Sequence, residues 1–397
     1  MLQLSFVSFK KGSFVIVEGK ANADRFYIIQ NGRVMVSRSN ELPGSTPEVL
    51  GPGDFVGVVS CMSGNSQIES AVAMTDVVCI AVRRDQYSEL INKNSAVAMK
   101  IIRTFANRMR TLNETLMQQT LNNSAVDTPE QIYQVAKYYD EDGSDSIACF
   151  AYYQYLKADR NGQFAKDATV RLAKLKPNSE AVYFEPTSDL MRKYPMNTMI
   201  FSESQTGADM FIIQSGSVKI SKVVDGTEVI LAILKKGDMF GEMALLENKP
   251  RSASAIAASD CQLMTVNKQN FNNMVATQPQ LIARLTTTFS ERLWSLNRQL
   301  TNSLLHADPV AQMIDMLVLQ LEKTNFDFDA RASYETQFSP NDIATMCGLS
   351  KQEQAKCLYK FMTFPLISVQ KNKIVVKQRD ELLKQSLFYR KKISKGM

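Results

Sequence analysis

The stretch FGEMALLENKPRSASA, residues Phe240–Ala255, places an acidic, a basic and several small residues close together in the chain. We call it the cassette. It offers one carboxylate, one guanidinium and backbone N–H groups at the start of a short predicted helix. A helix N-terminus favours an anion, and arginine presents two N–H groups to phosphate oxygens. The cassette therefore predicts a site for a sugar hydroxyl and a phosphate. The candidate ligand residues are Gly241, Glu242, Met243, Ala244, Arg251, Ser252 and Ala253.

The framework around the cassette occurs twice, at a constant offset of 184 residues. Residues 26–34 (FYIIQNGRV) align with residues 210–218 (MFIIQSGSV). Further blocks align at the same offset without a gap, among them Ser70–Ala73 with Ser254–Ala257. Several separated matches at one offset are typical of a duplicated unit. We predict two copies of one domain, at residues 3–122 and 187–306.

Each copy reads as a β-rich body followed by a long helix. Short runs of β-branched and aromatic residues are separated by glycine, which predicts a jelly-roll β-barrel. Asn31-Gly32 and Ser215-Gly216 predict hairpin turns, because glycine tolerates positive φ. An amphipathic run with helical spacing follows each barrel. The predicted fold class is therefore α+β and multidomain.

The two copies differ at the charged positions. At the offset of 184, Val58 stands where the second copy has Glu242, and Gln67 stands where it has Arg251. Glu69 adds a negative charge to the first copy. We therefore expect only the second copy to hold an anion. The first copy is interpreted as a structural pseudo-domain, an interface or a site for another ligand.

Residues 124–186 separate the two copies. Alanine and tyrosine recur there at helical spacing, which predicts a helical, tetratricopeptide-like connector. It contains 7 Lys and Arg against 10 Asp and Glu, which argues against contact with nucleic acid. One such unit cannot bury its apolar face alone. We expect it to dock on a barrel or to pair with another chain.

The C-terminal module, residues 308–397, is basic at its end: residues 331–397 hold 13 Lys and Arg against 5 Asp and Glu. Ser339 is predicted to cap a helix, with Asp342 at its third position. Gly348 is predicted to make the turn to a second helix, followed by a two-stranded wing. This order predicts a winged helix-turn-helix that binds DNA. The candidate DNA-binding residues are Ser350, Lys351, Gln352 and Lys356.

Composition narrows the function classes. No apolar run is long enough to span a membrane, and the N-terminus lacks the pattern of a signal peptide, so a cytoplasmic protein is expected. The six cysteines are scattered and are expected to be free thiols. With His306 as the only histidine, and without a P-loop, a metal cluster or a nucleophile–base pair, neither a metal site nor an enzyme is expected.

The cassette, the repeat and the C-terminal module resemble the CRP/FNR transcription regulators, whose cyclic-nucleotide-binding domain also occurs in the regulatory subunit of protein kinase A. The resemblance implies that Arg251 binds the cyclic phosphate and that Glu242 accepts from the ribose 2′-hydroxyl. Arginine followed by Ser-Ala resembles the cAMP-preferring members, so cAMP is favoured over cGMP. The resemblance also places base contacts on the helix after the second barrel, near Arg292, Ser295 and Asn297.

The expected function is a cAMP-responsive DNA-binding transcription regulator, in which ligand in the second barrel controls the winged helix. A signalling adaptor or regulatory subunit that binds a partner protein is the first alternative, and a cyclic-dinucleotide sensor is another. Pairing is open between two chains, which would form a homodimer, and the two barrels of one chain, which would form an intrachain pseudo-dimer. The sequence does not distinguish activator from repressor, or identify target genes.

Overall fold

The computed structural model describes residues 4–394 except residues 22, 39–46, 122–127, 225, 248, 325 and 350. The chain divides into two compact units. The first unit holds residues 1–90, 115–120 and 289–397, and the second holds residues 91–114 and 121–288. Each unit is therefore assembled from segments that lie far apart in the sequence.

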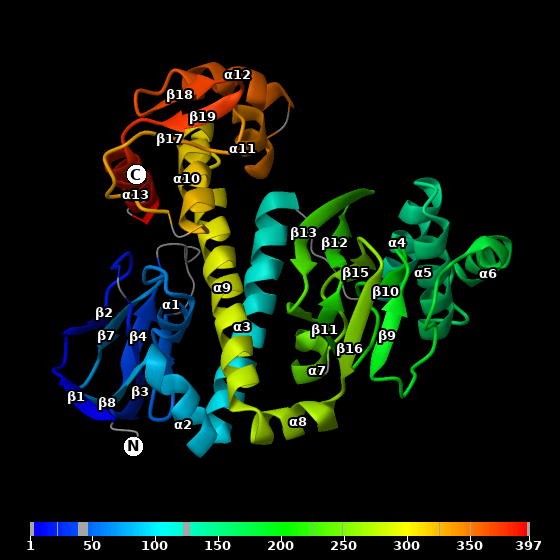
Figure 1. The fold of residues 1–397 in the computed structure, drawn as a ribbon, viewed down its shortest axis with the longest axis horizontal. Helices are drawn as coiled ribbons and strands as arrows, with labels where there is room; N and C mark the ends of the chain where they lie inside the picture. The colour runs from blue at the N-terminus through cyan, green and yellow to red at the C-terminus, as the bar shows by residue number, and fades with distance from the viewer. Residues whose placement is uncertain are drawn as a thin grey trace. The chain divides into compact units, whose positions relative to one another are not determined.

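The first copy contains two four-stranded antiparallel sheets (Figure 1). One has the order β1-β8-β3-β6, and the other has the order β2-β7-β4-β5. Apolar side chains from both sheets, including Ile29, Val34 and Ala71, meet in one core. We call this the first sandwich. Its strands are β1 (Ser5–Phe9), β2 (Phe14–Ile16), β3 (Arg25–Asn31), β4 (Val34–Ser37), β5 (Glu48–Leu50), β6 (Phe55–Val56), β7 (Ser70–Ala73) and β8 (Val77–Arg83).

The second copy repeats this topology strand for strand. Its sheets have the orders β14-β11-β16-β9 and β10-β15-β12-β13, which are those of the first copy carried forward by eight strands. We call it the second sandwich. Its strands are β9 (Met191–Tyr194), β10 (Met199–Phe201), β11 (Met210–Ser215), β12 (Ser217–Val224), β13 (Thr227–Lys235), β14 (Met239–Phe240), β15 (Ser254–Ala257) and β16 (Cys261–Val266). The predicted duplication is confirmed.

Two details of the predicted barrels are wrong. In the described part of the chain the sheets are not closed, so each copy is a sandwich of two sheets. The glycine turns also do not form hairpins, because β3 and β4 belong to different sheets, as do β11 and β12. Gly32 and Gly216 carry the chain from one sheet to the other at φ values of 93° and 84°. A Cβ at Gly32 would lie 2.4 Å from the Asp76 carbonyl oxygen, so a side chain does not fit there.

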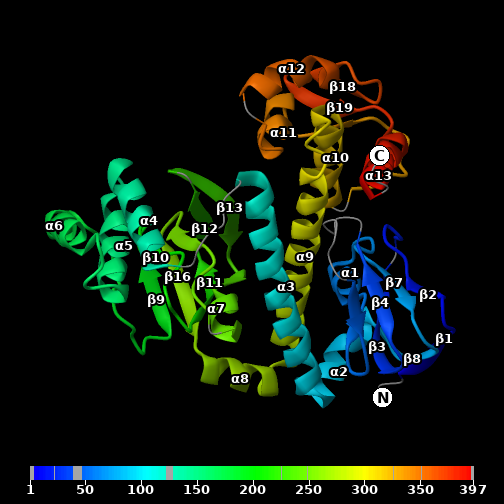
Figure 2. The same cartoon turned by 180° about the vertical axis from the view of Figure 1, so that it is seen from behind.

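Helices follow each sandwich. After the first come α2 (Tyr87–Lys93) and α3 (Ser95–Leu121), and after the second come α8 (Lys268–Thr277) and α9 (Pro279–Ser303). The predicted apolar face of α3 is buried at Ala98, Ile101, Ile102, Phe105 and Met109. Figures 1 and 2 both draw α3 beside the second sandwich and α9 beside the first.

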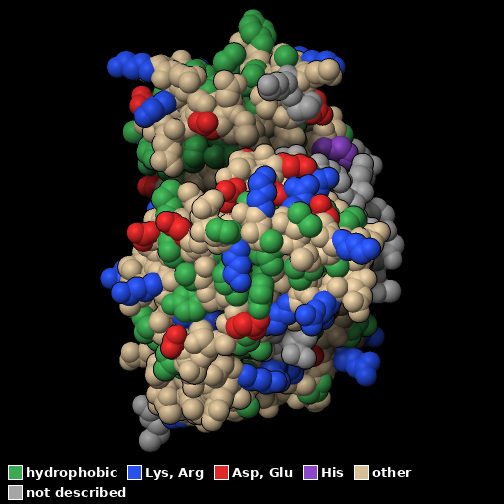
Figure 3. Space-filling view, turned by 90° about the vertical axis from the view of Figure 1, so that its right-hand side faces the viewer, with side chains coloured by type: hydrophobic (Ala, Val, Ile, Leu, Met, Phe, Trp, Pro, Cys, Tyr) green, Lys and Arg blue, Asp and Glu red, His purple; other side chains and the backbone are tan. Residues whose placement is uncertain are grey.

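The connector consists of α4 (Pro129–Glu141), α5 (Asp145–Ala158) and α6 (Ala165–Leu175), and it shares a core with Met199, Val223 and Ile256 of the second sandwich. The Tyr139 hydroxyl donates to Glu228 Oε1 at 2.6 Å. Of the two arrangements expected for the connector, the structure has the one in which it docks on a sandwich. On the face drawn in Figure 3, acidic and basic side chains are intermixed.

The C-terminal module packs around α10 (Pro309–Glu322). Ser339 caps the next helix as predicted: its Oγ accepts from Asp342 N, and the Asp342 carboxylate accepts from Ser339 N. The expected two-stranded wing is corrected to a three-stranded sheet of order β17-β19-β18, because Tyr334–Glu335 pairs with β19. The remaining elements are α11 (Pro340–Met346), α12 (Lys351–Met362), β17 (Tyr334–Glu335), β18 (Ile367–Gln370), β19 (Lys373–Val376) and α13 (Arg379–Ser394).

All six cysteines are described, and all are free thiols. Among the described helices, none is both long and apolar enough to cross a membrane.

Candidate functional site

The cassette of the second copy connects β14 to β15. Its helix, α7 (Glu242–Glu247), begins directly after Gly241, which has a φ of 77°. A Cβ at Gly241 would lie 2.8 Å from Arg251 Nη1, so the bare glycine lets the guanidinium approach the backbone. The helix start and the arginine are thereby brought together, as the sequence predicts.

Arg251 is buried, with 5% of its surface exposed. Its Nη1 donates to the Gly241 carbonyl oxygen at 2.7 Å, and its guanidinium lies 4.2 Å from the centre of the Phe201 ring. Its Nε has no hydrogen-bond partner within the described chain. The guanidinium is therefore held in position with part of its donor capacity unused.

Burial lowers the pKa of Arg251 to about 10, and the carboxylates of Asp209 and Glu242 oppose this shift. Of these two carboxylates, Asp209 forms an ion pair with Arg192 at 3.4 Å. Keeping a cation out of water is costly unless a counter-charge is close. An anion that binds Arg251 would offset this cost.

The other predicted cassette residues lie around the arginine. Glu242 is buried at the first position of α7, and its charge favours the protonated form of Arg251. Ser252 Oγ contacts Met243 Sδ at 3.7 Å, and Ala253 is buried. The side chain of Ala244 lies outside the described residues, although its backbone belongs to α7.

The sequence did not predict that the segment before β11, which includes Gln205 and Gly207, contacts Arg251. Arg251 N donates to the Gln205 carbonyl oxygen at 2.9 Å. A Cβ at Gly207 would lie 2.9 Å from Arg251 Nη2, which explains the glycine. The offset of 184 contains the signal, because the first copy has alanine at the positions of both residues. Gln205 and Gly207 therefore differ from their counterparts in the first copy, as Arg251 differs from Gln67.

At the equivalent site of the first copy, the cation Arg38 is already paired with carboxylates. Glu69 is buried, and its carboxylate lies 2.9 Å from Arg38 Nη2, which also pairs with Glu48. Burial alone would lower the pKa of Arg38, but Glu69 and Glu48 raise it above its ordinary value. Gln67 occupies the position of Arg251 and carries no charge. The described first site therefore has an internal ion pair where the second has a guanidinium whose Nε lacks a hydrogen-bond partner.

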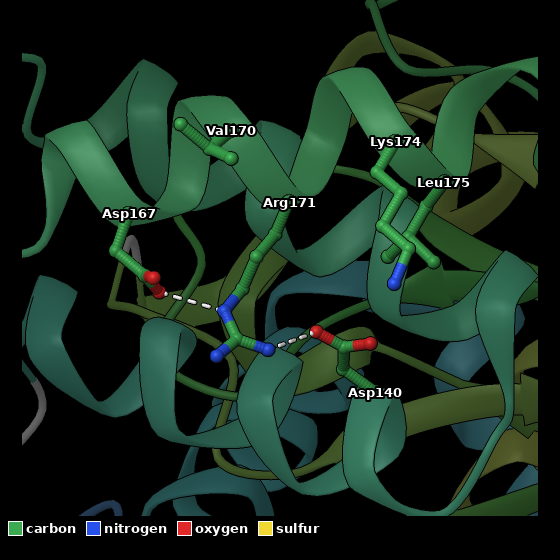
Figure 4. A pocket seen from close by; sticks show the side chains of 6 residues that line it. All are labelled: Asp140, Asp167, Val170, Arg171, Lys174 and Leu175. Carbon is green, nitrogen blue, oxygen red and sulfur yellow. Dashed lines mark hydrogen bonds and ion pairs between the residues drawn. The ribbon is translucent and has the colours of Figure 1, made fainter.

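A cavity of about 270 Å³ lies in the connector, and residues of α4 and α6 line it (Figure 4). Arg171 forms ion pairs with Asp140 at 2.6 Å and with Asp167 at 2.8 Å. The charged groups lining the cavity thus largely satisfy one another. No group of metal-ligating side chains was found among the described residues.

Three of the four predicted DNA-binding residues, Lys351, Gln352 and Lys356, belong to α12. Gln352 and Lys356 are exposed on this helix. Ser350 and the side chain of Lys351 lie outside the described residues. Exposure leaves Gln352 and Lys356 accessible to a macromolecular partner.

The predicted base-contacting residues are not brought to the cassette within one unit. Arg292, Ser295 and Asn297 belong to the unit of the first sandwich, whereas the cassette belongs to the other unit. The helix segment that shares a unit with the cassette is residues 91–114 of α3. Trp294, on the same turn of α9, is 2% exposed and is a core residue.

The duplicated architecture has a counterpart among known families. The family described as "Cyclic nucleotide-binding domain" matches residues 6–94 and again residues 191–278. The chain therefore contains two regions that match the cyclic nucleotide-binding domain family. The cassette lies in the second matched region, and Glu69 lies in the first. The resemblance noted from the sequence is thereby confirmed.

Relatives of the chain point to the same class. It is 23% identical over 194 residues to a CRP-like cAMP-activated global transcriptional regulator of Mycobacterium tuberculosis, covering 49% of this chain and 86% of the relative. It is 28% identical over 188 residues to the cAMP-activated global transcriptional regulator CRP of Pasteurella multocida, covering 47% and 89%. A solved structure, the Thermus thermophilus catabolite activator protein, covers 50% of this chain and 90% of its own at 22% identity, with a TM-score of 0.28. At that score the structural match adds nothing to the sequence matches.

Proposed function

We propose that the chain is a cyclic-nucleotide-responsive transcription regulator, with cAMP bound in the second cyclic nucleotide-binding domain. One observation carries the ligand assignment: Arg251 is a buried guanidinium with an unpartnered Nε, next to the N-terminus of α7. The cyclic phosphate would take up this donor capacity. The named activity of the relatives favours cAMP over cGMP or a cyclic dinucleotide.

The roles of the neighbouring residues follow from their chemistry. We assign to Glu242 the role of accepting from a ribose hydroxyl, because an ionised carboxylate only accepts hydrogen bonds. Gly241 keeps the backbone open to the phosphate, since it has no Cβ. In the first domain, the ion pair between Arg38 and Glu69 leaves no uncompensated cation, so we assign it no cyclic nucleotide.

Titration calorimetry of the full chain with cAMP, cGMP and a cyclic dinucleotide tests the ligand. Arg251→Gln should weaken cAMP binding by at least about 100-fold, because a charge-assisted, partly desolvated contact is lost. The matched control is Gln67→Ala, which alters the equivalent position of the first domain and should leave the affinity unchanged. Wild-type protein that binds none of the three ligands would refute the proposal.

We further propose that the C-terminal module is a winged helix-turn-helix that binds duplex DNA through α12, and that cAMP strengthens this binding. Lys356 is exposed on α12 and is assigned to the DNA backbone or a base edge. Fluorescence anisotropy with a duplex, measured over a range of salt, tests this. Lys356→Ala should reduce the salt slope by about 1 if it contacts a phosphate. Lys384→Ala, which removes a lysine already paired with Asp380 and Glu381, is the control. Salt-insensitive or absent DNA binding would favour the adaptor alternative.

A further inference from the structure

Two hydrogen bonds join the long helix of one copy to the other copy's cassette loop, by which we mean residues 249–253 in the second copy and the equivalent residues 65–69 in the first. Arg110 Nη2, on α3, donates to the Pro250 carbonyl oxygen at 3.1 Å. Trp294 Nε1, on α9, donates to the Ser66 carbonyl oxygen at 3.2 Å. Arg110 and Trp294 are related by the offset of 184, and so are Ser66 and Pro250. The same contact is therefore made twice, reciprocally.

The residues that make up each compact unit agree with this exchange of contacts between the copies. Residues 91–114, from the helix that follows the first sandwich, belong to the unit of the second sandwich. Residues 289–397, which begin within the helix that follows the second sandwich, belong to the unit of the first. Each sandwich is thus completed by a helix that the other copy supplies.

The two contacts differ in charge, as Arg251 of the second copy differs from Gln67 of the first. Pro250 directly precedes Arg251, and the side chain that holds it is a buried guanidinium, with 5% of Arg110 exposed. Ser66 directly precedes Gln67, and the side chain that holds it is an uncharged indole. A cationic donor makes a stronger hydrogen bond to a carbonyl than a neutral one does. The stronger clamp therefore lies on the cassette that keeps its phosphate-binding arginine.

We propose that the first copy is a built-in partner whose helix α3 holds the working cassette of the second copy, and that Arg110 is a positioning residue for cyclic-nucleotide binding. Arg110 acts by fixing the Pro250 carbonyl, and with it the backbone that presents Arg251. The degenerate first domain is then required for ligand sensing although its own Arg38 is already paired with Glu69 and Glu48. The ligand part of this inference rests on the proposed function; the helix exchange does not.

Hydrogen exchange of the unliganded full chain tests the exchange of helices directly. Arg110→Gln should speed amide exchange in residues 249–253 and leave residues 65–69 unchanged. Trp294→Phe, which keeps an aromatic side chain and removes the N–H donor, should do the reverse. If each variant instead loosens the cassette loop of its own copy, the helices are not exchanged and the proposal is wrong.

Calorimetry with cAMP tests the positioning role. Arg110→Gln should weaken cAMP binding about tenfold, which corresponds to one hydrogen bond from a charged donor. Arg110→Lys, which keeps a cationic donor, should restore part of the loss. Two controls should leave the affinity unchanged: Arg103→Gln, which removes the same charge from an exposed position of α3, and Trp294→Phe. An equal loss in Arg103→Gln and Arg110→Gln, or no rescue by lysine, would overturn the role of Arg110.

Hydrogen exchange with cAMP distinguishes failure of the positioning role from failure of the proposed ligand. Ligand should protect the cassette and, on the exchanged helix, residues 103–113 more strongly than residues 287–297. Protection of the cassette with residues 287–297 but without residues 103–113 overturns the positioning by α3 and leaves the proposed ligand intact. No protection of the cassette refutes the proposed ligand, while the unliganded experiment still decides the helix exchange.

Discussion

Asp315 on α10 lies at the centre of a buried charge cluster that joins three helices of one unit. Its carboxylate is fully buried and lies 3.2 Å from Arg298 Nη2 on α9 and 3.1 Å from Arg390 Nε on α13. The Ser386 hydroxyl donates to the same carboxylate at 2.6 Å. Asp315→Asn keeps the size of this side chain and removes its charge, so it tests how much the cluster contributes.

The expected loss in the free energy of unfolding depends on the charged groups that remain buried in Asp315→Asn. Without the carboxylate charge, Arg298 and Arg390 keep Glu322 as their anionic partner, at 3.0 and 3.7 Å. Removing one member of a buried ion pair costs roughly 3–5 kcal/mol, and we take the lower end, about 3 kcal/mol, because Glu322 stays. For a unit of this size the change corresponds to a fall of roughly 6–12 °C in the unfolding midpoint.

Differential scanning calorimetry of the full chain measures this change. The control is Asp380→Asn, which removes a carboxylate from an exposed ion pair with Lys384 on α13 and should leave the midpoint within error. A fall of less than about 2 °C for Asp315→Asn would contradict the reasoning, since it would mean that the cluster is hydrated or already compensated. The cluster links α9 to the C-terminal module, so the variant should also weaken any effect of cAMP on DNA binding.

Acid should remove the contribution of Asp315. Burial alone would raise the pKa of this carboxyl, but Arg298 and Arg390 lower it below its ordinary value. Because the pKa is lower in the folded state, the stabilisation is present above about pH 4 and is lost as the pH falls through the folded-state pKa. Urea unfolding of wild type and Asp315→Asn should therefore converge at low pH, and a constant difference down to pH 3 would contradict this. Gly241→Ala and Gly57→Ala should both destabilise by about 1–2 kcal/mol, because both positions have φ near 80°. Only the former should also abolish cAMP binding in calorimetry, since its Cβ would lie 2.8 Å from Arg251 Nη1, whereas the atoms nearest a Cβ at Gly57 are 3.6 Å away. Equal affinities for the two variants would show that the close approach at Gly241 is unimportant.

The sequence was sufficient for features that depend on local patterns and on internal comparison. The offset of 184 identified the duplication, and the apolar spacing identified the long helix at Ala98–Met109. Ser339 and Asp342 predicted the helix cap that the structure contains. Comparing the two copies showed that the second copy has Arg251 where the first has Gln67. Each of these inferences uses neighbouring residues, or two segments read against each other, and needs no knowledge of long-range pairing.

Only the tertiary structure decided which distant segments meet. It placed β3 and β4 in different sheets, although the turn at Gly32 had predicted a hairpin. It brought Phe201 and Gly207 against Arg251, and it joined Arg110 to Pro250, 140 residues further along the chain. Local propensity does not encode such pairings, because a β-strand or an amphipathic helix offers the same apolar face to any complementary surface. The partner is selected by the packing of the whole unit, and here that packing sets α3, from the first copy, against the cassette of the second.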